Sequence, residues 1–315
     1  MVFSATRRLR ANALYSVEYT LIGSIILTIL MSGLLSHIAN QSVAWSGFSL
    51  AYGLAIGALA LGLYIRVIKA MPGLGLLSIS YAIYVGFSSA ITLLIYLRFP
   101  VEVALIDPLL ISLDAKLGYS WQRGAALLAE YPAISAVLRL VYQSSLLQLF
   151  LLLAALCALG QFDRVHKAMF TGIFSLLLTV AIWWIWPSIG PAAYAELAKD
   201  IEIKAALVTN AQMGAYLQHL VQNGLEEISP DKIVGTIAFP SYHTVMALLV
   251  VWYTRGTLLF LPALLVNLAM MPAILTHGGH HLLDVLGGLY VFFLSAWAAS
   301  VFLTPRSQPA EPLQS

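Results

Sequence analysis

The stretch LGLLSISYAIYVGFSSAITLLIYL, residues 74–97, contains no charged side chain over a length that matches a bilayer-spanning helix. A helix rises about 1.5 Å per residue, so roughly 20 apolar residues cross the ~30 Å hydrocarbon layer. The strands of membrane β-barrels alternate polar and apolar residues over about ten positions, and this stretch does not alternate. It therefore predicts a membrane-spanning α-helix.

The whole chain has the composition of a membrane protein. Of its 315 residues, 60% are hydrophobic and only 10% are charged, whereas about a quarter of a soluble domain is charged. The net charge of +2, without a basic run interleaved with aromatic residues, argues against a nucleic-acid partner. Cys157 is the single cysteine, so the chain cannot form an internal disulfide, and we interpret it as a packing residue.

We predict an all-α, polytopic helical membrane protein with about eight transmembrane helices, the last five forming a catalytic bundle. Three regions are expected: a three-span region over residues 1–100, a catalytic membrane domain over residues 101–303, and a disordered tail over residues 304–315. The eight predicted spans are Tyr19–Leu35, Val43–Ile65, Leu74–Leu97, Leu138–Leu159, Ala168–Trp186, Tyr242–Tyr253, Thr257–Leu275 and Leu282–Phe302.

The distribution of Lys and Arg predicts the orientation, because cytoplasmic connections are enriched in these residues. The short connections around His37–Ser42 and Thr276–His281 contain neither, which predicts that they face outward, to the periplasm or lumen, and that both termini are cytoplasmic. The long segments Arg98–Val137 and Pro187–Phe239 then also face outward. The predicted cytoplasmic side carries Arg7, Arg8, Arg10, Arg66, Lys69, Arg164, Lys167, Arg255 and Arg306.

Both long segments are predicted to form helices on the outer face. Asp107-Pro108 is a helix start, with an N-cap acceptor followed by proline, and we expect the following leucine-rich helix to lie in the interface. Asp107 and Asp114 are interpreted as helix-start and surface residues. Pro191 to about Leu220 is predicted to be a helix-rich cap. The leucines expected on one face of the first helix are Leu109, Leu110, Leu113 and Leu117, and the expected pairs of the second segment are Glu196–Lys199 and Asp200–Lys204.

Two polar clusters begin apolar helices on the predicted outer side. The first is FPSYHT, residues 239–244, and the second is THGGHHLLD, residues 276–284. Ionisable residues at helix ends in a membrane protein are expected to be functional. A third polar break, WPSIGP at residues 186–191, ends the fifth predicted span on the same side and contains Pro187 and Gly190.

These clusters suit phosphate chemistry. Pro240 and Ser241 at a helix start leave backbone N–H groups free for an anion. His280 and Asp284 are one helical turn apart, so the carboxylate can hold the imidazole in one tautomer and stabilise its phosphorylated form. His243, from another helix, could protonate a leaving oxygen. Spacing alone does not separate His277 and His281 from His280, and both are predicted to be supporting residues.

The pattern Pro240-Ser241-x-His243, followed on a second helix by His280-x-x-x-Asp284, resembles the type 2 phosphatidic acid phosphatase superfamily. The resemblance implies a metal-independent reaction of a phospholipid substrate through a phosphohistidine, with no cofactor. It implies His280 as nucleophile, Asp284 as its orienting partner, His243 as general acid, and Ser241 with Tyr242 as phosphate-binding residues. Further features resemble the inositolphosphorylceramide synthase-like branch: Pro187…Gly190-Pro191, Asp107…Leu113-Asp114…Leu117-Gly118 and Asp284…Gly287-Gly288. For Asp107 and Asp114 this resemblance implies, as the alternative to surface positions, a structural role near the site.

The chain also departs from the pattern of the superfamily's phosphatases. Ala273 and Ile274 stand where those enzymes carry Ser-Arg, Trp186-Pro187 stands where they carry Arg-Pro, and Tyr242 replaces the usual glycine. Either another group neutralises the phosphate or the chain has lost activity, and both interpretations stay open. The candidates for such a group are Arg139, Lys199 and Lys204.

Several functions stay open at this point. If the phosphoryl group is transferred to water, the chain is a lipid phosphatase. If it is transferred to a lipid alcohol such as diacylglycerol or ceramide, the chain is a phosphotransferase, and the altered motifs favour this second function. The alternative from another class is a transporter or translocase that binds a head group with its outer histidines, although such proteins show internal repeats and none is present. A metal site of His243, His277, His280, His281 and Asp284 is disfavoured because adjacent helical residues diverge by ~100°.

Overall fold

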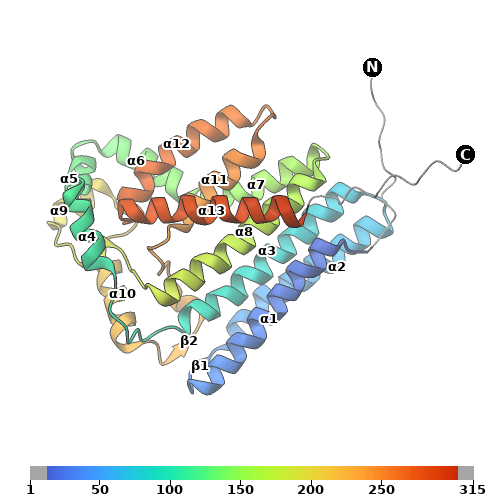
Figure 1. Ribbon diagram of the computed structural model, residues 1–315, viewed down its shortest axis with the longest axis horizontal. Helices are drawn as coiled ribbons and strands as arrows, with labels where there is room; N and C mark the ends of the chain where they lie inside the picture. The colour runs from blue at the N-terminus through green and yellow to red at the C-terminus, as the bar shows by residue number, and fades with distance from the viewer. Residues whose placement is uncertain (1–12, 304–315) are drawn as a thin grey trace, which may run out of the picture.

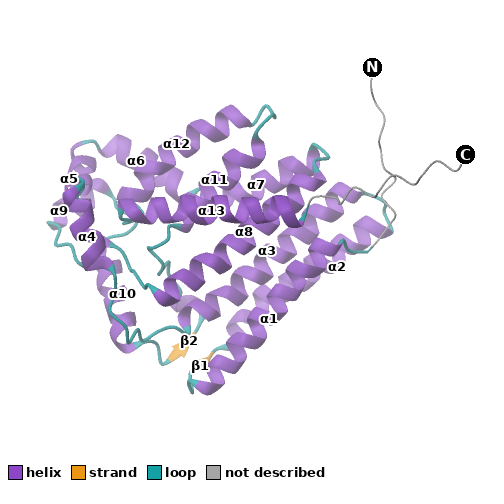
Figure 2. Cartoon of the chain, viewed as in Figure 1, coloured by secondary structure: helices purple, strands orange, loops and turns teal. Residues whose placement is uncertain are grey.

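The computed structural model describes residues 13–303, and over this range the chain is almost entirely helical (Figures 1 and 2). The predicted tail, residues 304–315, and the arginines at positions 7, 8, 10 and 306 lie outside the described residues. The all-α class is confirmed. The α-helices of the described residues are α1 (Ser16–Ile38), α2 (Trp45–Val67), α3 (Pro72–Tyr96), α4 (Asp107–Lys116), α5 (Trp121–Glu130), α6 (Pro132–Gln143), α7 (Ser145–Ala158), α8 (Phe162–Ile185), α9 (Lys199–Ala205), α10 (Ala211–Asn223), α11 (Tyr242–Thr254), α12 (Phe260–Thr276) and α13 (Leu282–Phe302).

Within residues 13–303 the number of full-length spans is smaller than the predicted eight. Five helices, α1, α2, α3, α8 and α13, are long and apolar enough to cross a membrane, and α6 with α7 makes a sixth candidate that is bent by 53°. The two remaining predicted spans are the apolar helices α11 and α12, of 13 and 17 residues. A 13-residue helix is about 20 Å long and falls short of the hydrocarbon thickness. Apolar composition therefore predicted the helices, but not their lengths.

One hydrophobic core joins the N-terminal helices to the rest of the bundle. It contains buried side chains of α3, α7, α8, α11 and α13, such as Ile83, Leu156, Met169, Leu249 and Phe292. The predicted boundary near residue 100 thus falls in a connection beside a continuous core. In Figure 1, α1, α2, α3 and α8 run side by side, and α13 crosses them toward the capping helices.

The two long segments, residues 98–137 and 187–239, form a helix-rich cap at the end of the bundle where α13 begins (Figure 1). The second segment contains the 3-10 turn η1 (Pro191–Ala193), α9 and α10, in agreement with the predicted helix-rich cap. The predicted Asp200–Lys204 pair is present at 3.3 Å, but Glu196 precedes α9 and makes no helical pair with Lys199. The described strands, β1 (Ser42–Val43) and β2 (Glu227–Ile228), pair in parallel and tie the α1–α2 connection to this cap.

A buried ionic cluster links three helices far from the cap. Arg66 of α2 binds Glu18 of α1 through both guanidinium amino groups, at 2.7 Å each, and His166 of α8 lies 3.1 Å from the same carboxylate. Glu18 is fully buried and Arg66 nearly so. Because a buried charge is costly without a partner, each side chain here depends on the other.

We predict that Arg66→Ala lowers the free energy of unfolding by about 3–5 kcal/mol, because it leaves the buried Glu18 carboxylate with only the Tyr15 N–H and His166 as partners. Thermal unfolding in detergent measures the loss. The exposed Lys69→Ala control should change stability by less than about 0.5 kcal/mol. A double Glu18→Leu/Arg66→Met variant should recover most of the loss, and a double variant as unstable as Arg66→Ala would contradict this account.

Candidate functional site

The second histidine cluster forms a tight loop between α12 and α13. His277 is the C-cap of α12 and His281 the N-cap of α13, so Gly278, Gly279 and His280 make the turn. Gly279 has a φ of +60°, a left-handed conformation that favours glycine. The turn brings His280 to the cavity described below.

Asp284 holds His280 in place from one turn further along α13. Its Oδ2 lies 3.1 Å from His280 Nδ1 and also accepts the backbone N–H of His281 at 2.8 Å. Both His280 and Asp284 are buried. With Nδ1 bound to the carboxylate, the Nε2 lone pair of His280 is the one available for chemistry.

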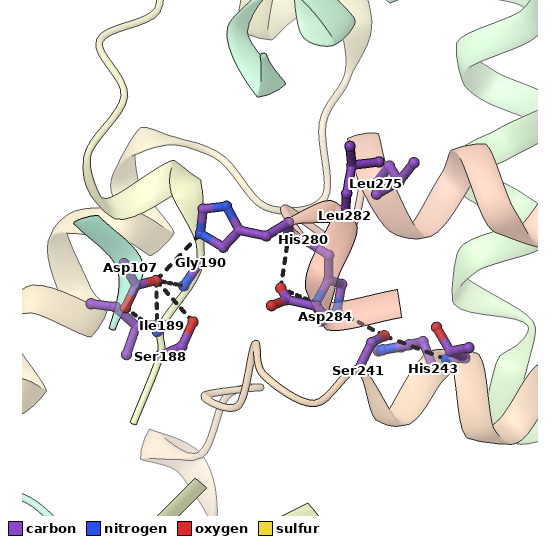
Figure 3. Close-up of polar contacts among 12 residues, drawn as sticks. Asp107, Ser188, Ile189, Gly190, Ser241, His243, Leu275, His280, Leu282 and Asp284 are labelled. Atoms are coloured by element: carbon purple, nitrogen blue, oxygen red, sulfur yellow. Dashed lines mark hydrogen bonds and ion pairs between the residues drawn. The ribbon is translucent and has the colours of Figure 1, made fainter. Parts of the chain in front are cut away.

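The first cluster meets this pair from α11. Ser241, the N-cap of α11, accepts the Thr244 N–H and lies with its Oγ 3.5 Å from His280 Nε2. The backbone N–H of Ser241 donates to the Asp284 carbonyl at 2.9 Å, which fixes the start of α11 against α13. His243, one residue into the helix, has its ring centroid 6.1 Å from that of His280. Figure 3 shows Ser241 and His243 on the Asp284 side of the loop.

Tyr242 points away from this centre. Its hydroxyl donates to the Gly172 carbonyl of α8 at 2.9 Å. For the predicted phosphate-binding role this leaves the Tyr242 backbone N–H, one of the unpaired donors of the first turn of α11. Pro240 is buried immediately before that turn.

Asp114 and Asp107 bind His281 from the opposite side. Asp114 Oδ2 lies 2.7 Å from His281 Nδ1, and Asp114 Oδ1 accepts the N–H of Leu282 at 3.1 Å. Asp107 Oδ1 lies 3.6 Å from His281 Nε2, a distance that suits an ion pair rather than a hydrogen bond. His281 is fully buried, and each of its two ring nitrogens faces a carboxylate.

The prediction that Asp107 and Asp114 are surface residues is therefore wrong. They are seven residues apart, which puts them on one face of α4, and that face is buried against the loop. Leu109 and Leu117 are exposed instead, while Leu110 is buried. Asp107 is also not the N-cap; Ile106 is. In a membrane protein an apolar helix face can be the outer one, so the leucines did not reveal which side faces the protein.

The Asp107 carboxylate also organises the polar break after α8. It accepts the Ser188 hydroxyl at 2.9 Å and the backbone N–H groups of Ile189 and Gly190, the latter at 2.7 Å (Figure 3). Gly190 has a φ of +89°, and a Cβ there would lie 2.5 Å from the Gly279 carbonyl oxygen. Pro187 accepts the N–H of Ile106 at 3.0 Å. Pro187 thus joins the end of α8 to the residue before α4, and Gly190 packs closely against the histidine loop. Both are supporting residues in this arrangement.

His277 faces α6 rather than His280. Its Nε2 lies 3.2 Å from Ser135 Oγ, and its carbonyl accepts the N–H of Thr209. Burial, partly opposed by the Ser135 contact, lowers the pKa of His277, so its neutral form is favoured. His277 is a supporting residue of the loop in this arrangement.

Sequence reasoning missed the aromatic residues that hold the loop. The Tyr119 hydroxyl donates to the Leu275 carbonyl at 2.9 Å, and Trp121 Nε1 donates to the Thr276 carbonyl at 2.8 Å. Tyr142, at the end of α6, stacks on His243 with ring centroids 4.3 Å apart. None of the three belongs to a motif, and only packing identifies them.

A cavity of about 260 Å³ opens beside His243 and His280. Its described lining contains hydroxyl, glycine and apolar residues but no Lys or Arg; other members are Tyr142, Ile189, Val208, Thr209, Met213, Leu217, Gly235, Thr236, Ile237, Ala238, Gly278 and Gly279. The predicted cationic candidates Arg139, Lys199 and Lys204 are all exposed and outside this lining. Among residues 13–303, no group of three or more His, Cys, Asp or Glu side chains is arranged to hold a metal ion.

The fold and the site define a helical membrane protein with a buried His–Asp pair at a cavity near one end of its bundle. The family model described as the PAP2 superfamily, the type 2 phosphatidic acid phosphatases, matches residues 108–298, and the chain belongs to this superfamily. No curated protein and no solved structure matches the chain. Members of the superfamily are generally phosphatases or phosphotransferases, which supports a lipid phosphatase or phosphotransferase type of function in general.

The charge of His281 gives a pH prediction. Burial acts to lower the pKa of His281, but the surrounding carboxylates, Asp107 first, outweigh it and raise the pKa above 6.5. The stability contributed by the charged imidazole is thus fully present below pH 6.5 and is lost as the pH rises through the raised value. We expect Asp114→Asn to cost about 1–3 kcal/mol at about pH 6 and less at about pH 9.

Thermal unfolding in detergent at the two pH values checks this expectation. Asp200→Asn is the matched control, because it removes the charge of an exposed i,i+4 pair and should cost at most about 0.5 kcal/mol at either pH. An Asp114→Asn loss that is equal at both pH values would show that the charge on His281 does not contribute.

Proposed function

We propose that the protein transfers phosphoryl groups on lipids, with His280 as the nucleophile and a phosphohistidine as the intermediate. The observation that carries the proposal is the geometry of His280, whose Nδ1 is bound to Asp284 while Nε2 lies 3.5 Å from Ser241 Oγ beside the cavity. This arrangement directs the Nε2 lone pair toward the cavity and keeps a carboxylate ready to stabilise the cationic ring.

His281 is a poor alternative nucleophile. It is fully buried, and its two ring nitrogens face Asp114 and Asp107 at 2.7 and 3.6 Å. His280 has one nitrogen on a carboxylate and the other beside the cavity. The contrast supports the assignment of the reaction to His280 and of a positioning role to His281.

The proposed reaction has two balanced halves. His280 Nε2 attacks phosphorus, the bond to the leaving oxygen breaks, and His243 gives that oxygen a proton. An acceptor hydroxyl then attacks the phosphohistidine, the P–N bond breaks, and His243 takes up the hydroxyl proton. The Ser241 hydroxyl and the first backbone N–H groups of α11 would bind the phosphoryl oxygens, since a helix N-terminus attracts anions.

The lining of the cavity favours a phosphodiester substrate and transfer to a lipid alcohol, as in the inositolphosphorylceramide synthase-like branch. A phosphomonoester carries close to two negative charges at neutral pH, whereas a diester carries one. The described lining has no Lys or Arg to balance the second charge. A phospholipid diester fits this lining better, and its leaving group is an alcohol that needs the proton of His243.

We predict that three substitutions separate the catalytic roles. His280→Ala removes the nucleophile and should abolish the phosphoenzyme and turnover. Asp284→Asn keeps the shape but loses the charge, and should lower kcat by about 10²–10⁴-fold. His243→Ala should lose about 10²–10⁴-fold with natural phospholipids and much less with nitrophenyl phosphate esters, whose leaving group needs no proton.

Purified protein and labelled phospholipids, with and without diacylglycerol or ceramide, measure these effects and distinguish a water-soluble phosphate product, released by hydrolysis, from a new lipid product. A chelator is present throughout, because the proposed steps use no metal. The control is His219→Ala, an exposed histidine of α10, which should retain wild-type turnover. Equal losses on both substrate types for His243→Ala would exclude it as the general acid.

We further propose that the cavity opens on the periplasmic or lumenal side, because Lys and Arg concentrate in the short connections at the opposite side. Gly235 lines the cavity, and a side chain there meets open space, so Gly235→Cys suits labelling. In intact cells of a Cys157→Ala background, this thiol should react with an impermeant reagent. The matched Lys69→Cys thiol, on an exposed connection of the predicted cytoplasmic side, should react only after permeabilisation. The reverse pattern would overturn the proposed orientation.

A further inference from the structure

Among the described residues, Tyr142 is the one aromatic side chain of the cavity lining apart from the histidines, and it contacts His243 and the loop at Gly278. It lies in the last turn of α6, just before the bend that separates α6 from α7. No motif in the sequence includes it. Its position therefore comes only from the way α6 packs against α12 beside the histidine loop.

The Tyr142 ring covers the His243 ring face to face. The ring centroids are 4.3 Å apart, the planes are inclined by only 23°, and the Tyr142 hydroxyl lies 3.4 Å from His243 Nδ1. At that distance, and with the rings stacked, the hydroxyl contact is weak and the stacking is the main interaction. Among the described residues no hydrogen bond reaches His243 Nε2, so this nitrogen is free to act on a substrate.

The same ring also contacts the loop that carries His280. A Cβ on Gly278 would lie 2.8 Å from Tyr142 Cε2 and 2.9 Å from His280 Cδ2. Glycine at this position is what lets the tyrosine ring and the His280 ring both approach the loop backbone. Tyr142 thus stacks on His243 and also borders the loop that carries His280.

The partner of His243 differs in kind from that of His280. His280 has the carboxylate of Asp284, whereas among the described residues no Asp or Glu pairs with His243. An aromatic face attracts a cation, so it stabilises the protonated imidazole when His243 carries its proton. It does so without the permanent ion pair that would hold the proton too firmly, and it keeps the ring from turning away from the cavity.

We propose that Tyr142 is the positioning residue of the general acid: it holds His243 by stacking and keeps Nε2 directed at the leaving oxygen. The proposal rests on the proposed function of His243 and adds a residue to it. Tyr142 does not touch the phosphorus or exchange a proton; it acts through His243. Its effect must therefore depend on whether the leaving group needs a proton.

The test compares two substrates in three variants. Tyr142→Leu removes the ring and should lower kcat on a natural phospholipid by about 10–100-fold, less than the loss of His243 itself, with KM little changed. On a nitrophenyl phosphate ester it should lose less than about threefold. Tyr142→Phe keeps the stacking and the packing volume, so it should recover most of the phospholipid activity. Tyr131→Leu, an exposed tyrosine at the start of the same helix, is the control and should behave as wild type on both substrates.

Each outcome decides the proposal. If Tyr142→Leu loses the same factor on both substrates, its selectivity between them equals that of the wild type, the role of Tyr142 is merely structural, and the proposal is overturned. If Tyr142→Leu does not fold, a Tyr142→Phe variant as poor as His243→Ala on the phospholipid would overturn the stacking role, and recovery by Phe would support it. If the wild-type enzyme is active and the Tyr142 variants behave like it, the role of Tyr142 is overturned while the proposed function stands. A wild-type protein that forms no phosphohistidine and turns over neither substrate would overturn the proposed function and this inference together.

Discussion

The Asp284 residue makes the contacts on which the rest of the site depends. Its carboxylate binds His280 Nδ1 and the backbone N–H of His281, and its carbonyl accepts the N–H of Ser241 from a different helix. One residue therefore orients the proposed nucleophile, shapes its loop, and fixes the start of α11 against α13. A buried carboxylate is costly without donors, and the two donors of Asp284, both at Oδ2, come from the histidine loop, so the geometry of the loop and the charge of Asp284 depend on each other.

A second layer of acidic residues supports the first from outside the two histidine clusters. Asp114 and Asp107 bind His281, and Asp107 also accepts the N–H groups of Ile189 and Gly190. Through these contacts α4 and the end of α8 are joined to the start of α13. The negative charges of this layer face His281 and leave the cavity lined by uncharged side chains and histidines. This separation of charge is the physical basis for proposing a singly charged phosphodiester as the substrate.

Much of the site was predictable, because its residues occur in short patterns whose spacing has a direct geometric meaning. A histidine and an aspartate four residues apart at a helix start are in contact, and so are His280 and Asp284. A serine after proline at a helix start is an N-cap, and Ser241 is one. Tyr242 was different: its neighbours suggested a role at the phosphate, but its direction along α11 takes the hydroxyl to Gly172.

By itself, the sequence determined the helical membrane class, the helix-rich cap, and the two histidine clusters, because apolar length and residue spacing act locally along the chain. The tertiary structure decided which face of α4 is buried, that α11 and α12 are shorter than a span, and that Tyr142 stacks on His243. These features depend on contacts between residues far apart in the chain. In a membrane protein, apolar side chains can face lipid as well as the core, so hydrophobicity marks a helix but not the side that packs inward. Only the positions of the neighbouring helices settle that choice.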